Sequence, residues 1–235
     1  MRIGILGAGH IGSALARYVV ALGHQVKIAN SRGPGTLRDV AAQTGAQPAT
    51  VDEAARDAEL VVVTIPMKAV ATLPKPLFAG LGSDVIVIDT NNYYPSRDDR
   101  IEPVEAGQLE SAWVAEQIGR PVIKAFNNIF AASFAANAAP KGSPKRLALS
   151  VAGDQQTARE KVLRLVDDIG FDPVDTGPLS ESWRQQPGTP CYCKDFGADE
   201  MRRALAQADR ARIAEYRAQA DEAARPYFLA ERLKR

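Results

Sequence analysis

Three closely spaced glycines near the N-terminus are the residues of this sequence that most directly indicate chemistry. They occur in Gly7-Ala8-Gly9-His10-Ile11-Gly12, between the short apolar run 3–6 and the amphipathic stretch 13–22. A strand, a glycine turn and a helix in this order can hold a pyrophosphate, because the second glycine admits the phosphates and the third lets helix and strand pack closely. The exposed N–H groups at the helix start favour a negative charge. We therefore expect these six residues to bind a dinucleotide; the alternative is an ordinary glycine turn.

The residues after the next predicted strand, 24–29, indicate which dinucleotide is expected. They are Asn30-Ser31-Arg32, at the place where an NAD-binding protein usually carries Asp or Glu. Ser31 can donate to a phosphate oxygen, and Arg32 can pair with a 2′-phosphate and cover the adenine. A hydrogen bond to a charged group contributes about 1.5–3 kcal/mol, and about 1.4 kcal/mol is tenfold in affinity. We therefore predict NADP(H), against the alternative of a solvated arginine in a turn.

Polar residues also follow two apolar runs, 60–65 and 84–89. The first run leads into Thr64-Ile65-Pro66, and the second is followed by Asn91 and Asn92. Ligands of parallel sheets lie across the carboxyl ends of the strands. We expect the 64–66 segment to bend over the nicotinamide ribose and the two amides to bind its ribose or carboxamide. Alternatively, these residues only form turns.

The elements that must position these residues alternate between strand and helix, which predicts an α/β fold with a Rossmann-type doubly wound, mostly parallel sheet. Runs 60–65 and 84–89 are continuously apolar, as in strands covered on both faces. Ser111 is expected to cap a helix at 112–118. Further strands at 121–126, 146–152 and 171–175 extend the sheet. No linker separates them, so residues 1–182 are predicted to form one dinucleotide-binding domain.

Residues 183–235 are expected to form a C-terminal extension, with a loop followed by a long helix. Segment 183–196 is rich in Pro, Gly and Gln and is long enough for a lid or an oligomer contact. Segment 199–224 predicts one helix with a thin apolar stripe, typical of docking onto a partner. Pro226 is expected to end this helix. The apolar tip Tyr227-Phe228-Leu229 then needs a covering surface, on its own subunit or on a neighbour.

Composition argues against several other classes of protein. The chain has 235 residues, 46% of them hydrophobic, with a net charge of +1, so nothing favours a nucleic-acid or anionic-membrane partner. No apolar run is long enough to span a bilayer, and we expect a cytoplasmic protein. Cys191 and Cys193 are expected to be reduced thiols. With His10 and His24 as the two histidines, no metal site is predicted.

The chain resembles the NADPH-dependent reductases of the deazaflavin coenzyme F420, and also the cytosolic NADPH oxidoreductase domain of the six-transmembrane ferric reductases. The resemblance covers residues 1 to about 182. It rests on five features in the same order, the glycine loop with Ser31-Arg32, Thr64-Ile65-Pro66, Asp89-Thr90-Asn91-Asn92, Lys124-Ala125-Phe126-Asn127 and Asp175-Thr176-Gly177-Pro178-Leu179. Where the deazaflavin enzymes usually have His-Thr, this chain has Asn127-Asn128. With Asn127 in an Ala-Phe-Asn context, the segment is more similar to the ferric reductase version.

The resemblance implies an NADP(H)-dependent oxidoreductase, a homodimer, that transfers hydride to or from a flavin or deazaflavin co-substrate. Asn127 would then position this small-molecule electron acceptor against the nicotinamide. Two alternatives stay open. A carbonyl or imine reductase would need a proton donor, for which Lys68, Tyr93, Tyr94 and Lys124 are available. A non-catalytic NADPH-binding regulator would bind the cofactor without turnover.

Overall fold

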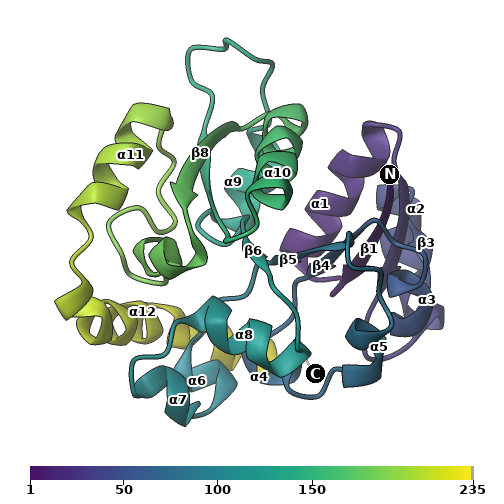
Figure 1. Cartoon of the computed structure of the whole chain (residues 1–235), viewed down its shortest axis with the longest axis horizontal. Helices are drawn as coiled ribbons and strands as arrows, with labels where there is room; N and C mark the ends of the chain where they lie inside the picture. Colours follow the sequence, from purple (N-terminus) through teal and green to yellow (C-terminus); the bar gives the residue numbers. More distant parts are fainter. Residues whose placement is uncertain (234–235) are drawn as a thin grey trace.

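One eight-stranded sheet forms the centre of the molecule in the computed structural model, which describes residues 1–233 (Figure 1). The strand order is β3-β2-β1-β4-β5-β6-β7-β8, and each neighbouring pair is parallel except β6 and β7. The α/β class and the extended, mostly parallel Rossmann-type sheet are thus confirmed. The strands are β1 Arg2–Leu6, β2 Gln25–Ala29, β3 Gln47–Pro48, β4 Leu60–Val63, β5 Ile86–Asp89, β6 Ile123–Lys124, β7 Ala148–Ala152 and β8 Asp172–Gly177.

Helices cover both faces of this sheet. They are α1 His10–Ala21, α2 Arg38–Thr44, α3 Val51–Ala55, α4 Met67–Val70, α5 Lys75–Ala79, α6 Pro95–Asp98, α7 Glu102–Glu105, α8 Glu110–Ile118, α9 Ala131–Ala136, α10 Gln156–Ile169, α11 Ala198–Gln207 and α12 Ile213–Leu233. Short 3₁₀ helices occur at η1 Pro34–Leu37, η2 Leu179–Gln185 and η3 Arg210–Arg212. In Figure 1, α1 and α2 lie at the right with the first strands, and α11 and α12 lie at the left.

Strand β4 shows why helices cover both faces of the sheet. Its four residues are all buried, and successive side chains of a strand point to opposite faces. Val62 packs in one apolar cluster with residues of α1, α9 and α10, whereas Val61 and Val63 pack in a second cluster with α3, α4 and α8. The carboxyl ends of the parallel strands are left as the edge on which a ligand can lie.

The C-terminal extension differs from the prediction of one long helix. The chain leaves the helical conformation at Ala208 (ψ 133°), and Asp209 then caps the following turn by accepting from the Ala211 N–H at 2.9 Å. This break lets α11 pack Met201 and Leu205 on β7 and β8, while α12 runs on past α6. A single rigid helix could not reach both surfaces.

Pro226 does not end α12, which was expected, but lies inside it. Proline costs a helix one N–H bond, yet the helix continues because the residues beyond it are anchored. The Phe228 ring lies 5.0 Å from the Tyr94 ring and 5.3 Å from the Arg97 guanidinium. The predicted apolar tip therefore finds part of its covering surface on its own chain, although Tyr227 and Leu229 remain more than half exposed.

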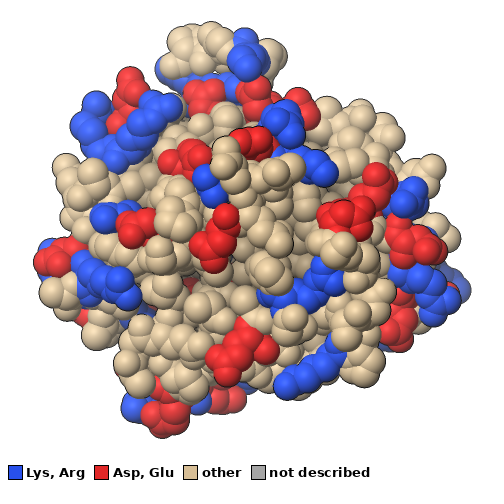
Figure 2. All heavy atoms as spheres, in the orientation of Figure 1, with Lys and Arg blue, Asp and Glu red and all other residues tan. Residues whose placement is uncertain are grey.

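One face of the molecule shows how the charged side chains are distributed. On the face drawn in Figure 2, basic and acidic side chains are interspersed rather than gathered into one patch. Among the residues that the structure describes, no helix combines the length and the apolar character needed to cross a membrane.

Candidate functional site

The three glycines of the loop between β1 and α1 have three different environments. Gly7 has a φ of +124°, and a Cβ there would lie 2.0 Å from the Thr64 carbonyl oxygen. A Cβ on Gly12 would lie 2.1 Å from the Gly7 carbonyl oxygen, so helix and loop are packed against each other. A Cβ on Gly9 would meet nothing within 4 Å. The fold therefore needs glycine at positions 7 and 12, whereas the bare backbone at position 9 is open for a ligand.

Helix α1 begins at His10, earlier than the stretch 13–22 expected for it. Its first internal hydrogen bond runs from the Ser13 N–H to the Gly9 carbonyl, at 2.8 Å, so the N–H groups of residues 10–12 have no partner within the helix. Gly9 provides no side-chain cap, and the first turn contains no acidic residue. The positive end of α1 thus borders the open backbone of Gly9, which suits a bound pyrophosphate.

The segment after β2 presents Arg32 on the surface. The Asn30 amide is used inside the loop, since its Oδ1 accepts from the Arg32 N–H and its Nδ2 donates to Thr36 Oγ1, both at 2.9 Å. Ser31 and Arg32 are exposed, and within the described part of the chain no hydrogen bond or ion pair engages the Arg32 guanidinium. Asn30 therefore shapes the turn, and Ser31 and Arg32 are the groups left available to a phosphate.

The tails of β4 and β5 lie side by side, as predicted for neighbouring parallel strands. Asn91 is buried, and its Oδ1 accepts from the Ile65 N–H at 3.1 Å. Its Nδ2 is buried as well and has no partner among the described residues. A buried N–H donor without a partner is costly, so this atom is a candidate ligand contact. Thr64 and Ile65 are half-buried beside it, and exposed Pro66 starts α4.

A buried ion pair behind Asn91 was missed by the sequence reasoning. Lys124 Nζ lies 3.2 Å from Asp89 Oδ2, and both side chains are fully enclosed. Ser111 does not cap α8, which begins at Glu110, but donates its hydroxyl to Asp89 Oδ2 at 2.7 Å. The physical reason is that Ser111 lies inside α8, where its hydroxyl meets a buried carboxylate that needs hydrogen-bond donors. The available signal was a lysine, Lys124, within the apolar run 121–126 that the sequence predicts as a strand.

Asn127 joins three segments of the chain. Its Nδ2 donates to Asn92 Oδ1 at 3.0 Å and to the Gln185 carbonyl at 2.7 Å, while Gln185 Nε2 donates to Asn127 Oδ1 at 2.8 Å. In return, Asn92 Nδ2 donates to the Asn127 carbonyl at 2.9 Å. The expected loop 183–196 therefore packs into the site region rather than hanging over it as a free lid, and its start at Gln185 is fully buried.

The four residues considered as proton donors all have other partners. Lys124 and Lys68 are in ion pairs, and Tyr93 and Tyr94 are in hydrogen bonds. The partners, in that order, are Asp89 at 3.2 Å, Asp99 at 3.1 Å, Glu105 at 2.8 Å and Tyr192 at 2.6 Å. Burial raises the pKa of Tyr93 to about 12. All four side chains therefore have a protein partner in this structure, and the carbonyl or imine reductase stays an alternative.

Cys191 and Cys193 are both free thiols, as expected. Burial raises the pKa of Cys191 to about 12 and that of Cys193 to about 11. Both groups are therefore protonated near neutral pH, and a thiol without thiolate character is a poor nucleophile and metal ligand.

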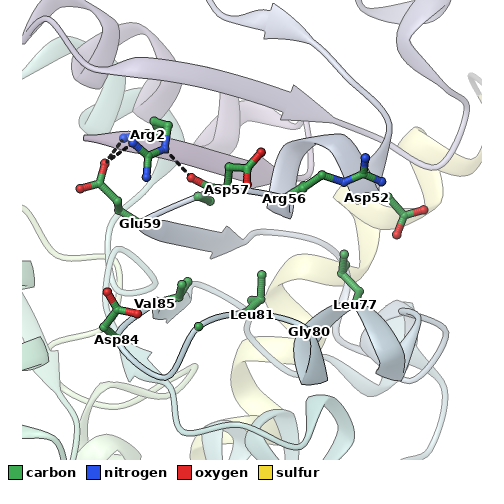
Figure 3. A pocket seen from close by; sticks show the side chains of 12 residues that line it. Arg2, Asp52, Arg56, Asp57, Glu59, Leu77, Gly80, Leu81, Asp84 and Val85 are labelled. Carbon is green, nitrogen blue, oxygen red and sulfur yellow. Dashed lines mark hydrogen bonds and ion pairs between the residues drawn. The ribbon is translucent and has the colours of Figure 1, made fainter.

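Two of the grooves on the described surface lie at different edges of the sheet. One, of about 570 Å³, adjoins the glycine loop and includes Gly9, His10 and Ser13 in its lining. The other, of about 430 Å³, lies at the amino ends of β1, β4 and β5 (Figure 3). In this second groove Arg2 is engaged by Glu59 and by the Asp57 carbonyl, so its charge is already paired. The first groove alone continues the glycine loop.

Glu110, which lies near the site, has a strongly raised pKa. It is almost fully buried, and its Oε2 accepts from the Tyr93 N–H at 3.2 Å. Burial raises the pKa of Glu110 from 4.5 to about 7, while the charges of Lys124 and Arg217 act in the opposite direction. Between these two pH values the folded protein keeps a proton that the unfolded chain has lost, so stability falls as the pH rises through this window.

We expect Glu110→Gln to remove this pH dependence. The amide still accepts from the Tyr93 N–H but cannot ionise, so the variant should match the parent near pH 4.5 and exceed it at pH 8 by up to about 3 kcal/mol. Urea unfolding at both pH values measures the difference. A variant that is less stable than the parent at pH 8 would contradict the assignment.

Fold and loop together define a protein of the Rossmann class. Residues 2–93 match the family described as NADP oxidoreductase, coenzyme F420-dependent. A hypothetical protein from Sinorhizobium meliloti, SMa0349, is 31% identical in sequence; its structure covers 83% of this chain and 94% of its own, with a TM-score of 0.71.

Two further proteins are similar over different extents. The Escherichia coli protein YjhV is 54% identical over 69 residues, which are 29% of this chain and 50% of YjhV, so this chain matches half the length of that relative. A structure from an Arthrobacter species, provisionally described as an F420-dependent NADP reductase, is 22% identical, covers 77% of this chain and 87% of its own, and has a TM-score of 0.63. At that identity the likeness shows the fold.

Proposed function

We propose that this protein binds NADP(H) and transfers hydride between it and a flavin-like or deazaflavin acceptor. One observation carries the proposal: Gly9 is open where Gly7 and Gly12 are closed, at the uncapped start of α1. The match of residues 2–93 to that family supports it, as does the exposed Arg32 after β2, whose guanidinium has no partner among the described residues. The unpartnered Nδ2 of Asn91 fits the same ligand, because it leaves one donor for the nicotinamide half.

Each group of residues has one task in this proposal. The N–H groups of residues 10–12 hold the pyrophosphate, and Ser31 and Arg32 hold the 2′-phosphate. Asn91 and Asn92, with the 64–66 segment, orient the nicotinamide ribose at the carboxyl edge. Bound NADPH supplies the hydride, and the protein supplies position, since the donor carbon must lie about 3–3.5 Å from the accepting atom. Hydride transfer between stacked rings needs no protein acid, in agreement with the neutral amides gathered here.

The proposed homodimer and the proposed class of acceptor follow from the family resemblance. The acceptor is tested directly by comparing four compounds. NADPH oxidation is followed at a fixed protein concentration with a flavin, the deazaflavin, a quinone and a small carbonyl as acceptors. We expect turnover with one of the ring acceptors and preference for NADPH over NADH. Binding of NADPH without turnover by any of them would favour the regulator instead. Turnover with the carbonyl alone would favour a carbonyl reductase.

We expect Asn127→Ala to lower kcat with a ring acceptor about tenfold and to change the NADPH dissociation constant less than about twofold. The substitution removes the bonds that hold Asn92 and Gln185, so the acceptor side loses its fixed geometry, whereas the phosphate contacts that dominate affinity lie elsewhere. Steady-state kinetics and a fluorescence titration give the two numbers. Asn137→Ala, on the exposed end of α9, is the matched control. Equal losses in both quantities would make Asn127 a cofactor residue.

A further inference from the structure

The buried pair Lys124–Asp89 has a role that stability does not explain. The two side chains are 1% and 0% exposed, and their charged atoms are 3.2 Å apart. Taking two charges out of water costs several kcal/mol each, and replacing such a pair by apolar residues is often neutral or stabilising. The pair lies at the carboxyl ends of β5 and β6, where the proposed nicotinamide site begins. Its surroundings therefore indicate what it does.

Both charges act on the backbone of Asn91. The Asn91 N–H donates to Asp89 Oδ1 at 2.8 Å, and the Asn91 carbonyl accepts from Lys124 Nζ. Ser111 holds the other oxygen of Asp89 at 2.7 Å. Both peptide groups beside the Asn91 Cα are thereby fixed by side chains that cannot move into solvent. The direction of its Cα–Cβ bond is fixed with them.

The side chain of Asn91 is fixed as well, and one of its two polar atoms has no partner among the described residues. Its Oδ1 accepts from the Ile65 N–H at 3.1 Å, which turns Nδ2 away from β4. Nδ2 is buried and has no partner among the described residues. A rigid, dehydrated donor of this kind is what an oxygen acceptor of a ligand needs for a strong and selective hydrogen bond.

We propose that Lys124 is a positioning residue that holds Asn91 so that its Nδ2 donates to an oxygen of the nicotinamide ribose or carboxamide. This inference rests on the proposed function. Lys124 itself does not touch the ligand, because its Nζ is enclosed by Asp89 and by the Asn91 carbonyl. It acts through the asparagine, so its removal affects the nicotinamide half of the cofactor and not the adenosine half.

The test compares two ligands that differ in that half. Dissociation constants are measured by calorimetry for NADPH and for the 2′-phosphate of ADP, which lacks both the nicotinamide and its ribose. The variant is Asp89→Asn/Lys124→Met, which removes both buried charges and keeps an amide oxygen for the Asn91 N–H. We expect the preference for NADPH over the fragment to fall about tenfold, with fragment affinity changed less than about twofold. In an Asn91→Ala background the same pair of changes should have no further effect.

Two additional variants keep the inference testable. Arg146→Met removes another buried charge, one that pairs with Asp167 and Asp172, and should lower stability without changing the ligand preference. If the double variant does not fold, Ser111→Ala leaves both charges in place and should lower the preference about two- to threefold. If the folded double variant or the folded Ser111→Ala variant kept the parent's preference for NADPH over the fragment, the inference about Lys124 would be overturned, and the proposed function would still stand. If the wild-type protein binds neither ligand, the proposed function fails instead.

Discussion

Gly9→Ala is expected to reduce NADPH affinity about 100-fold while leaving the free energy of unfolding unchanged within about 0.5 kcal/mol. The backbone at Gly9 has φ −78° and ψ −171°, which alanine adopts without strain, and the new Cβ would meet no protein atom within 4 Å. It would instead occupy the surface on which the pyrophosphate is proposed to lie. Loss of one or two charge-assisted hydrogen bonds accounts for a change of this size. Calorimetric titration with NADPH and urea unfolding measure the two quantities.

Gly12→Ala, in the same loop, is expected to have the opposite effect and to lower stability. Its Cβ would lie 2.1 Å from the Gly7 carbonyl oxygen and 2.9 Å from Thr64 Cγ2, so helix α1 would have to move away from the loop. We expect a loss of about 3 kcal/mol in stability. If both variants lost stability equally, or if Gly9→Ala bound NADPH normally, the open glycine would not mark a phosphate site.

Arg32→Ala is expected to weaken NADPH binding by between about 10- and 100-fold and NADH binding by less than about twofold. The guanidinium has no protein partner in the described structure, so its removal should not disturb the fold, and NADH lacks the phosphate with which it would pair. The range follows from about 1.5–3 kcal/mol for one charged hydrogen bond. Titrations with both dinucleotides at one ionic strength give the ratio.

Arg56→Ala is the charge-matched control for that experiment. Arg56 is exposed and lines the groove at the amino edge of the sheet (Figure 3), whereas the cofactor is proposed to lie at the carboxyl edge, so the change in net charge is the same but falls outside the proposed site. Its NADPH affinity should match that of the parent. Equal weakening of NADPH and NADH by Arg32→Ala would remove the argument for specificity and leave Arg32 a general contact or a structural residue.

The glycine loop could be predicted because each of its requirements is local. A positive φ at Gly7, a helix start at His10 and a packed Gly12 all arise within a few residues, and residue types report such demands directly. The alternation of strands and helices was also accessible, since continuous apolar runs alternate with helical ones. The ends of the helices were harder to predict from the sequence. The break after Gln207 and the continuation past Pro226 depend on what each segment packs against.

By itself, the sequence determined a doubly wound sheet, the open backbone at its first turn, and an exposed arginine where an acid would be expected for NAD. Only the tertiary structure decided that Asn91 leaves one buried donor free, that Lys124 and Asp89 hold its backbone, and that Asn127 is tied to Gln185. The reason is sequence distance. The hydrogen bonds that join Asn91 to Ile65, Lys124 to Asp89 and Asn127 to Gln185 link residues 26 to 58 positions apart in the chain. Contacts over such separations leave no periodic pattern in the sequence.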